Sequence, residues 1–202
     1  DQAEDFLDDD PVPPGGVESA LPPDSSIAHY RITGKLGEGG MGVVYEARDT
    51  RLERTVALKF LPAHLVADAD AKARMLREAR AAAALDHVNV CTIHDVGETD
   101  TGQVFIAMAC YAGETLERML RHGPLPIEAS LDFAVQIAHG LAGAHDRGIV
   151  HRDVNPANIM VTPERAGAAS RRVLKLLDFG LASTMHASLA KGGPIMGTVA
   201  YM

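Results

Sequence analysis

Hydrophobic and polar residues alternate in several short runs along the first half of the chain. A repeat of two is typical of strands that bury one face, so each run predicts a β-strand. In one of these runs, alternation places Thr55, Ala57 and Lys59 on the same face. The predicted strands of this half are residues 30–36, 43–48, 53–60, 90–96 and 103–108.

The second half of the chain changes to an apolar repeat of three to four residues, which is typical of amphipathic helices. It predicts helices over residues 114–121 and 126–147, while residues 70–85 form one helix within the strand-rich half. Two short strands, residues 159–161 and 173–177, follow the last helix. We therefore expect an α+β fold with a β-rich first lobe and a helical second lobe.

The acidic charge of the chain is concentrated at its beginning. The net charge is −8, but residues 1–29 hold eight acids and no Lys or Arg, so residues 30–202 carry 19 acids and 19 bases. This balance does not favour a nucleic acid as partner. The acidic, Pro- and Gly-rich residues 1–29 are expected to be a disordered tail, with a docking or autoinhibitory segment as the alternative.

The remaining composition favours a cytoplasmic domain. No apolar run is long enough to span a bilayer, so we expect no membrane segment. The acidic N-terminus does not resemble a signal peptide. Cys91 and Cys110 lack the spacing of a metal or redox pair. We interpret both as small buried apolar residues in a reducing compartment.

Residues 37–42, Gly-Glu-Gly-Gly-Met-Gly, lie between two predicted strands. A dinucleotide-binding glycine motif requires a helix at that point, and a P-loop requires Gly-Lys-Ser/Thr, which is absent here. A glycine-rich turn between strands forms a flexible hairpin whose backbone N–H groups can cover phosphates. An ordinary hairpin turn remains the alternative for this motif alone.

The strongest chemical signal is the stretch at residues 151–158, His-Arg-Asp-Val-Asn-Pro-Ala-Asn, followed by Asp178-Phe179-Gly180. The two carboxylates of Asp153 and Asp178 and the amide of Asn158 form a set that can hold a divalent cation with oxygen ligands while one carboxylate stays free to accept a proton. This combination is the equipment of phosphoryl transfer.

Taken in order, these motifs resemble the eukaryotic-like (Hanks-type) protein kinase domain of the bacterial serine/threonine branch. The resemblance implies an N-lobe at residues 30–108, a hinge at 109–113 and a C-lobe from 114 to 202 that is C-terminally truncated. It rests on Gly37-x-Gly39-x-x-Gly42-x-Val44, Val56-Ala57-Leu58-Lys59, Glu78, His151-Arg152-Asp153, Asn158, Asp178-Phe179-Gly180 and Gly197-Thr198-x-x-Tyr201-Met202.

The resemblance also implies the reaction and the roles of the residues. ATP and Mg²⁺ would be the cofactors, and a protein with a Ser or Thr acceptor would be the partner. Lys59, paired with Glu78, would hold the α- and β-phosphates, Asp153 would accept the hydroxyl proton, and Asn158 with Asp178 would hold Mg²⁺. The residues that would surround the nucleotide are Leu36, Gly37, Glu38, Gly39, Gly40, Met41, Gly42, Val43, Val44, Ala57, Met108, Ala109, Tyr111 and Met160.

Two further features follow from the resemblance. Ile93, His151 and Phe179 would stack between the lobes. Arg152 would pair with a phosphorylated residue and so order the loop after Gly180. The candidate regulatory residues in and after that loop are Ser183, Thr184, Ser188 and Thr198.

The sequence departs from the family at two positions. Asn155 stands where serine/threonine kinases usually carry Lys, and an uncharged donor predicts slow but real transfer. On this interpretation Asn155→Lys should raise turnover at least tenfold. Ala82 stands where a larger apolar residue is expected in the stack between the lobes. That substitution predicts weak basal activity, which Ala82→Leu should improve.

The chain stops at Met202, before the Pro-Glu motif and the helices with which the family continues. We expect a fragment whose helix at 127–147 shows apolar surface to water. Asn155 and the truncation keep a pseudokinase or nucleotide-binding switch open as the alternative function. A small-molecule kinase of similar fold is a third possibility, which the ending from Gly197 to Met202 argues against because it resembles a peptide-docking segment.

Overall fold

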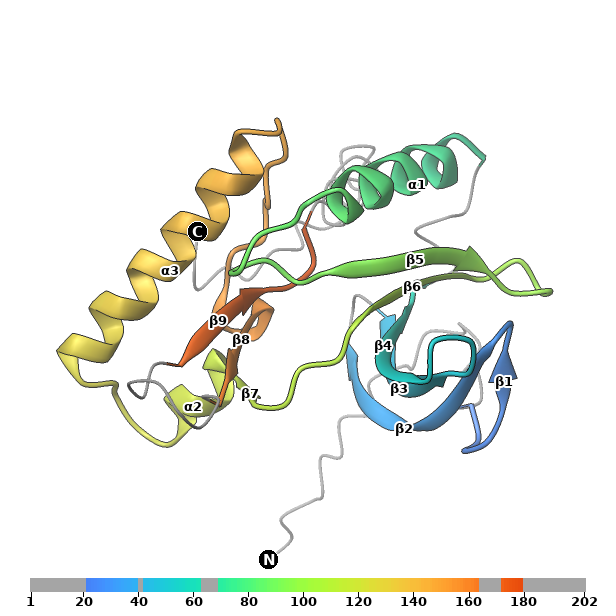
Figure 1. The fold of residues 1–202 in the computed structure, drawn as a ribbon, viewed down its shortest axis with the longest axis horizontal. Coiled ribbons are helices and arrows are strands. Elements are labelled where there is room, and N and C mark those ends of the chain that lie inside the picture. Colours follow the sequence, from blue (N-terminus) through green and yellow to red (C-terminus); the bar gives the residue numbers. More distant parts are fainter. Residues whose placement is uncertain (1–20, 40–41, 63–68, 164–171, 180–202) are drawn as a thin grey trace, which may run out of the picture.

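The computed structural model describes residues 21–39, 42–62, 69–163 and 172–179, which form two lobes (Figure 1). The first lobe contains β1 (Ser26–Ile27), β2 (Tyr30–Gly39), β3 (Gly42–Asp49), β4 (Arg54–Phe60), α1 (Ala69–Ala83), β5 (Ile93–Glu98) and β6 (Val104–Ala109). The second lobe contains β7 (Glu114–Thr115), α2 (Leu116–Arg121), α3 (Ile127–His145), the 3₁₀ turn η2 (Pro156–Asn158), β8 (Ile159–Thr162) and β9 (Val173–Leu176).

The sheet of the first lobe is antiparallel, with the strand order β1-β2-β3-β4-β6-β5. Alternation along β4 sends Val56, Leu58 and Phe60 into an outer cluster of aromatic and aliphatic side chains. The opposite face of β4 carries Ala57 and Lys59, which are both buried. The predicted common face of these two residues is therefore confirmed, and it is the face that looks toward α1 and the second lobe.

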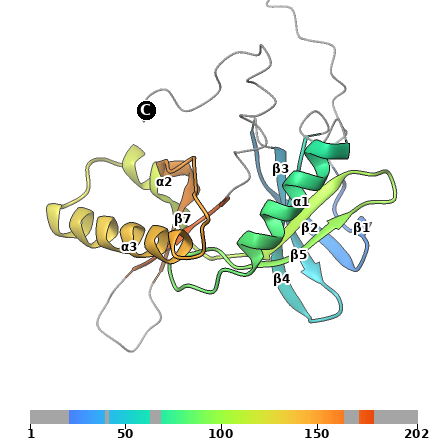
Figure 2. The ribbon, with the colours of Figure 1, turned by 90° about the horizontal axis from the view of Figure 1, so that it is seen from above.

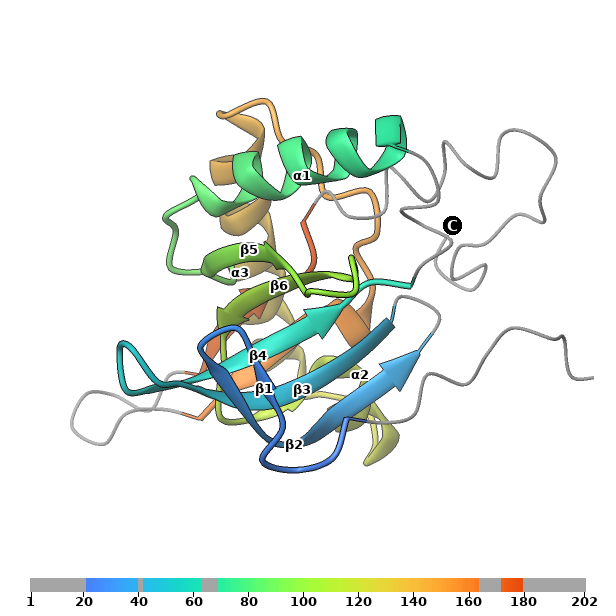
Figure 3. The same cartoon turned by 90° about the vertical axis from the view of Figure 1, so that its right-hand side faces the viewer.

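Helix α1 covers β5 at the edge of the sheet farthest from β1 (Figures 2 and 3). Its apolar stripe includes Met75, Ala79 and Ala82, spaced by four and three residues, and all three are buried. Met75 and Ala79 pack with the sheet, whereas Ala82 joins the core of the second lobe. The last turn of α1 therefore lies at the boundary between the lobes.

In the second lobe α3 packs on β9, within the three-stranded antiparallel sheet β7-β8-β9. Gly140 allows this close approach, because a Cβ there would lie 2.8 Å from the Leu176 side chain and 3.1 Å from the Asn89 carbonyl oxygen. The other side of α3 exposes Ile127, Leu131 and Val135. The prediction that this helix shows apolar surface to water is confirmed.

The structure departs from the sequence predictions at two boundaries. Glu114 and Thr115 form β7 instead of the first turn of a helix, because they pair with Val161 and Met160 of β8. Ordered structure also begins before Tyr30, since β1 pairs with β2 within residues that were assigned to the disordered tail. Residues 1–20 of that tail lie outside the described residues.

The structure confirms the expected burial for one of the two cysteines. Cys91 is buried, Cys110 is half-buried, and both are free thiols. No helix within the described ranges combines the length and hydrophobicity needed to cross a bilayer.

Candidate active site

The loop between α3 and β8 fixes the carboxylate of Asp153 from both sides. Its Oδ1 accepts a hydrogen bond from Asn155 Nδ2 at 2.9 Å, and its Oδ2 accepts one from Asn158 Nδ2 at 2.7 Å. Asn158 Nδ2 also lies 2.9 Å from the Asp153 carbonyl oxygen. Hydrogen bonds to an ionised acceptor are the stronger kind, so the carboxylate is held in one orientation. An oriented carboxylate of this kind is a group that can accept a proton from a hydroxyl, and Asp153 is half-buried.

Asn155 has a second function in the same loop. It is the N-cap of η2, and its Oδ1 accepts hydrogen bonds from the backbone N–H groups of Ala157 at 3.0 Å and Asn158 at 3.2 Å. Asn followed by Pro is a favourable start for a helical turn, because Asn supplies the acceptor and Pro lacks the N–H group that would stay unpaired. The amide nitrogen and the amide oxygen of Asn155, the side chain expected to face the transferred phosphoryl group, therefore both form hydrogen bonds within the loop.

His151 connects this loop to the segment that carries Asp178. Its Nε2 lies 2.8 Å from the Leu177 carbonyl oxygen, and its Nδ1 lies 3.3 Å from the Asp153 backbone nitrogen. Burial lowers the pKa of His151, so the neutral ring donates through Nε2 and accepts through Nδ1. The ring centroid is 4.5 Å from that of Phe179. Two segments that are far apart in the sequence are therefore held together around one imidazole.

Lys59 and Asp178 meet across the boundary between the lobes. Lys59 Nζ donates to Asp178 Oδ2 at 2.7 Å, and the two side chains are only 4% and 17% exposed. The resemblance also implies a pair between Lys59 and Glu78, which lies half-buried on α1. That pair stays a prediction.

Two residues beside the reacting groups have left-handed backbone conformations. The φ angles are 66° at Arg152 and 60° at Asp178. This region costs a residue with a Cβ roughly 1–2 kcal/mol. Such conformations persist where surrounding contacts impose them, and they concentrate at functional sites. At Asp178 the ion pair with Lys59 is one such contact, and it directs the carboxylate into the space between the lobes.

The walls of the predicted adenine site come from five strands, four in the first lobe and one in the second. Ala57 of β4 is the cross-strand neighbour of Met108 of β6, and Val44 of β3 is the neighbour of Lys59, so these side chains share one face. Met160 of β8 contributes from the second lobe. The last wall residue, Leu36, is half-exposed at the end of the hairpin that the glycines form.

Of the predicted glycines, Gly42 shows the clearest structural requirement. Its φ is 110°, in the region that favours glycine. A Cβ at this position would lie 1.9 Å from the Phe60 carbonyl oxygen, so only glycine fits. Gly37 pairs with Val44, Glu38 pairs with Val43, and Gly39 pairs with Gly42 along the β2–β3 ladder. The predicted residues Gly40, Met41, Gly180, Ser183, Thr184, Ser188 and Thr198 lie outside the described residues.

The hinge contains contacts that the sequence did not reveal. The Ala109 N–H donates to the Thr92 carbonyl oxygen at 2.9 Å, and the Cys91 thiol lies 4.0 Å from the Ala109 carbonyl oxygen. The Tyr111 hydroxyl accepts from the Thr92 N–H at 3.3 Å, and Lys175 Nζ lies 5.1 Å from the centroid of the Tyr111 ring. Lys175 is the cross-strand neighbour of Met160, a residue that the sequence predicts at the adenine site. That pairing is the one signal that could have pointed to Lys175.

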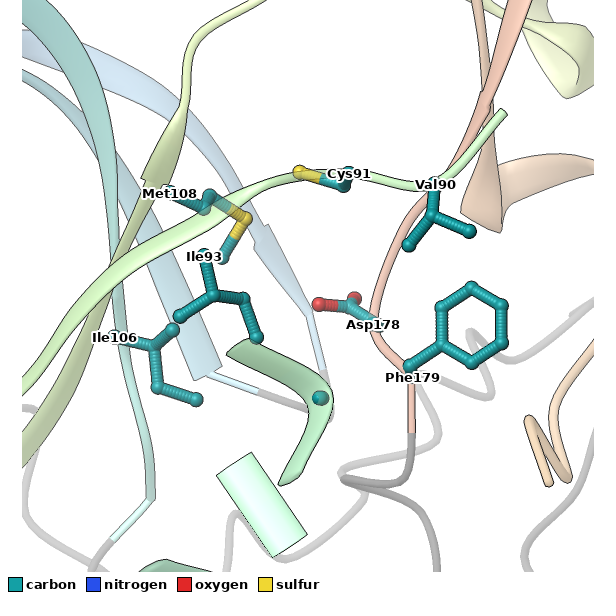
Figure 4. Close-up of a pocket in the computed structure, with 8 residues that line it drawn as sticks. Val90, Cys91, Ile93, Ile106, Met108, Asp178 and Phe179 are labelled. Atoms are coloured by element: carbon teal, nitrogen blue, oxygen red, sulfur yellow. The ribbon is translucent and has the colours of Figure 1, made fainter. Parts of the chain in front are cut away.

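A small cavity lies beside Asp178 and Phe179 (Figure 4). Its volume is about 10 Å³. That is room for about one water molecule. The thiol of Cys91 belongs to this lining, and burial, with a smaller contribution from Asp178, raises its pKa to about 12. We therefore describe Cys91 as an inert apolar group. The lining consists of Ala82, Val90, Cys91, Ile93, Ile106, Met108, Asp178 and Phe179.

The donor atoms at the site suit a hard divalent cation. Because Asn158 uses its amide nitrogen on Asp153, its amide oxygen is the atom that can act as a ligand. Asp178 supplies a carboxylate as the other predicted ligand. No cluster of three His, Cys, Asp or Glu side chains occurs in the described part of the chain. One carboxylate and one amide fit an ion such as Mg²⁺, which takes its other ligands from phosphate and water.

Comparison with known proteins agrees with this geometry. The sequence model described as "Protein kinase domain" matches residues 30–202. This chain belongs to the protein kinase family. Two relatives are named serine/threonine-protein kinases: PknJ of Mycobacterium tuberculosis is 40% identical over 178 residues, and PknE of Mycobacterium bovis is 43% identical over 175 residues. The matches cover 88% and 86% of this chain, but only 30% of either relative.

The fold agrees with a solved kinase as well. The crystal structure of the PknI kinase domain of Mycobacterium tuberculosis superimposes with a TM-score of 0.71 at 32% sequence identity. The superposition covers 87% of this chain and 69% of that structure. The predicted α+β, two-lobed kinase fold is confirmed. Membership in the family implies the use of ATP and a divalent metal ion.

Proposed function

We propose that this chain transfers the γ-phosphoryl group of ATP, bound with Mg²⁺, to Ser or Thr hydroxyls of a protein substrate. The observation that carries the proposal is the contact of Lys59 with Asp178, together with the hydrogen bonds that join the Asp178 segment to the loop of Asp153 and Asn158, from the Leu177 N–H to the Asn158 carbonyl and through His151. A cation for phosphates, a carboxylate for the metal ion and a fixed proton acceptor are the three parts that phosphoryl transfer requires.

Lys59 would hold the α- and β-phosphates through its ammonium group. Its position on β4, next to the β2–β3 hairpin, supports this role, since backbone N–H groups of the glycine loop can cover the same phosphates. Asn158 and Asp178 would hold the metal ion, which when bound supplies positive charge next to the transferring phosphoryl group. The ion pair of Lys59 with Asp178 keeps both groups directed toward this point.

Asp153 would orient the acceptor hydroxyl and take its proton. The hydroxyl oxygen forms a bond to the γ-phosphorus while the bond from phosphorus to the β,γ-bridging oxygen breaks, and ADP leaves. A carboxylate whose two oxygens are fixed by amides loses little freedom when the hydroxyl arrives. The neutral His151 would keep this loop in register with Asp178.

The cytoplasm, where ATP is available, would be the site of action. Arg152 would remain available to a phosphorylated residue, since its side chain is exposed. One observation favours the non-catalytic alternative, a pseudokinase or nucleotide-binding switch. The family's usual Lys at position 155 is replaced by Asn, so a positive charge near the phosphoryl group is missing.

Radiolabelled ATP with a generic basic protein as acceptor would test the proposal in the whole protein that carries this chain. We expect incorporation by the wild type and its loss in Asp153→Ala, with Asp146→Ala as an exposed acidic control that keeps activity. ATP binding without incorporation in the wild type would support the switch. An absence of ATP binding would overturn both functions.

A further inference from the structure

Asn155 occupies the position of a family lysine but makes contacts that lysine cannot make. We propose that Asn155 is a positioning residue that holds the Asp153 carboxylate, and that it does not replace the lysine at the phosphoryl group. The inference rests on the proposed function, because it assigns Asp153 the proton-accepting role. It concerns the group of three that we call the amide clamp: Asn155, Asp153 and Asn158.

The orientation of the Asn155 amide follows from its neighbours. Its oxygen accepts from two backbone N–H groups, those of Ala157 and Asn158, at 3.0 and 3.2 Å. Its nitrogen faces the Asp153 carboxylate at 2.9 Å. Exchanging nitrogen and oxygen would place donors against donors and an oxygen against a carboxylate. The recorded orientation is therefore the one that satisfies every partner.

The clamp is symmetric about the carboxylate. Asn155 donates to one oxygen and Asn158 donates to the other, and both residues are only 8% exposed. Two buried donors on separate oxygens restrict the rotation of the carboxylate more than one donor does. Asn155 itself cannot rotate away, because its oxygen is held by the start of η2. The cap thus fixes the donor, and the donor fixes Asp153.

A lysine at position 155 would change both contacts. An ammonium group has three donors and no acceptor, so it cannot cap η2. An Asn155 that reached for a phosphoryl group would have to release either Asp153 or the two N–H groups. Because the contact with the Asn158 N–H is buried and the other two are partly buried, releasing them leaves polar groups without partners at a free-energy cost. The contacts therefore favour the clamp over phosphoryl contact.

Asn155→Asp separates the two functions of the side chain. Asp keeps an acceptor for the cap and is an equally good N-cap residue, but it puts a carboxylate where the donor was. We expect kcat to fall at least about tenfold, since a misplaced catalytic group can cost as much as roughly 10²-fold. The Kd of Mg-ATP should stay within about twofold of the wild type, and the melting temperature should remain within a few degrees.

Asn155→Lys and Thr115→Ala complete the set. Asn155→Lys should give no more turnover than the wild type, because the added charge comes with the loss of the cap. Thr115 caps α2 by accepting from the Arg118 N–H at 3.3 Å, so Thr115→Ala removes a cap of the same kind away from Asp153. It should lower the melting temperature and leave kcat and the KM for ATP unchanged. A purely structural role for Asn155 would make its variants behave like Thr115→Ala.

Two kinetic results would overturn the inference: a kcat within about twofold of the wild type in Asn155→Asp, or a gain of about tenfold in Asn155→Lys. A spectroscopic test does not need activity. The side-chain NH₂ signals of Asn155 and Asn158 should both move in the NMR spectrum of Asp153→Ala. If only the Asn158 signal moves, the clamp does not exist, even if the wild type phosphorylates its substrate. An inactive wild type in which both signals move would refute the kinase activity and keep the clamp.

Discussion

Two of the junctions between the lobes are built in different ways. In the polar junction Asn89, before β5, meets Gln136 of α3 and Leu174 of β9. Asn89 Nδ2 donates to Gln136 Oε1 at 3.0 Å and to the Leu174 carbonyl at 3.1 Å, while the Leu174 N–H donates to the same Gln136 oxygen at 3.0 Å. In the apolar junction Ala82 of α1 lies beside Ile93 and Phe179 around the small cavity.

The hydrogen-bonded junction and the apolar junction attach different parts of the first lobe to the second lobe, and they do so with different firmness. Residues 89–91 also form backbone hydrogen bonds with Leu176, at 2.8 Å from the Leu176 N–H to the Asn89 carbonyl and 2.8 Å from the Cys91 N–H to the Leu176 carbonyl. This segment is thus part of the second lobe in mechanical terms. The last turn of α1 packs on the second lobe through apolar contacts with an unfilled space next to them, so α1 is the element whose position is less firmly set.

The largest effect is expected from the ion pair that crosses the boundary between the lobes. Lys59→Met should lower kcat/KM by roughly 10²–10³-fold, the cost of losing one preorganised charge at a reaction centre. A phosphorylation assay at several ATP concentrations measures it. The matched control is Lys72→Met, which removes the surface ion pair of Lys72 with Glu98 on α1 and β5. Equal losses in both variants would show that the charge of Lys59 has no special role.

The second-largest effect is expected from a substitution that breaks the polar junction. Gln136 is 7% exposed and accepts from the Asn89 amide and the Leu174 N–H, so Gln136→Leu takes this acceptor away from two buried donors. We expect the free energy of unfolding to fall by about 2–4 kcal/mol, since each unpaired buried group costs about 1–3 kcal/mol. Chemical denaturation measures this.

The control for that experiment is His139→Leu, at an exposed position on the same helix. It should change the free energy of unfolding by no more than about 0.5 kcal/mol, as is usual for surface substitutions. Similar losses at both positions would mean that the polar junction is no stronger than ordinary helix surface. The comparison between the two junctions would then fail.

Filling the apolar junction should have a smaller effect. Ala82→Val adds two methyl groups next to the small cavity. One of them can occupy the room for one water molecule and the other must be accommodated by its neighbours, so we expect at most about 1 kcal/mol of stabilisation, together with a lower KM for ATP. The sequence suggested Ala82→Leu, but the size of the cavity predicts overpacking by about 1–3 kcal/mol in that variant. Melting temperatures and ATP kinetics of the Val and Leu variants distinguish filling of the cavity from overpacking. A more stable Leu variant than Val variant would show that α1 adjusts freely.

The smallest effect concerns the pH dependence of stability. Burial keeps the pKa of His151 below that of an exposed histidine, so the unfolded chain binds a proton that the folded chain does not. Stability attributable to His151 is therefore complete above about pH 6.5 and decreases as the pH falls below that value. Denaturation between pH 7.5 and 5.5 measures the slope. His151→Phe should flatten it, and an unchanged slope would contradict a neutral His151.

Prediction from the sequence succeeded where a local pattern determines the result. Alternation in 53–60 correctly placed Ala57 and Lys59 on the inner face, and apolar spacing found α1 and α3 close to their observed ends. It failed at Glu114 and Thr115, where pairing with β8 overrides local helix propensity. It also missed β1, because such a short strand in a Pro-rich segment has no pattern of its own.

The linear motifs identified the kinase family, and they selected Asp153, Asn158 and Asp178 as predicted site residues, because these depend on residue types at fixed spacings. Contacts between distant segments were not in that pattern. Lys59 beside Asp178, the buried amides of Asn89 and Gln136, and the room next to Ala82 exist only once both lobes are packed. The function of Asn155 was also decided by the fold, since a cap and a donor are defined by the partners that surround an amide.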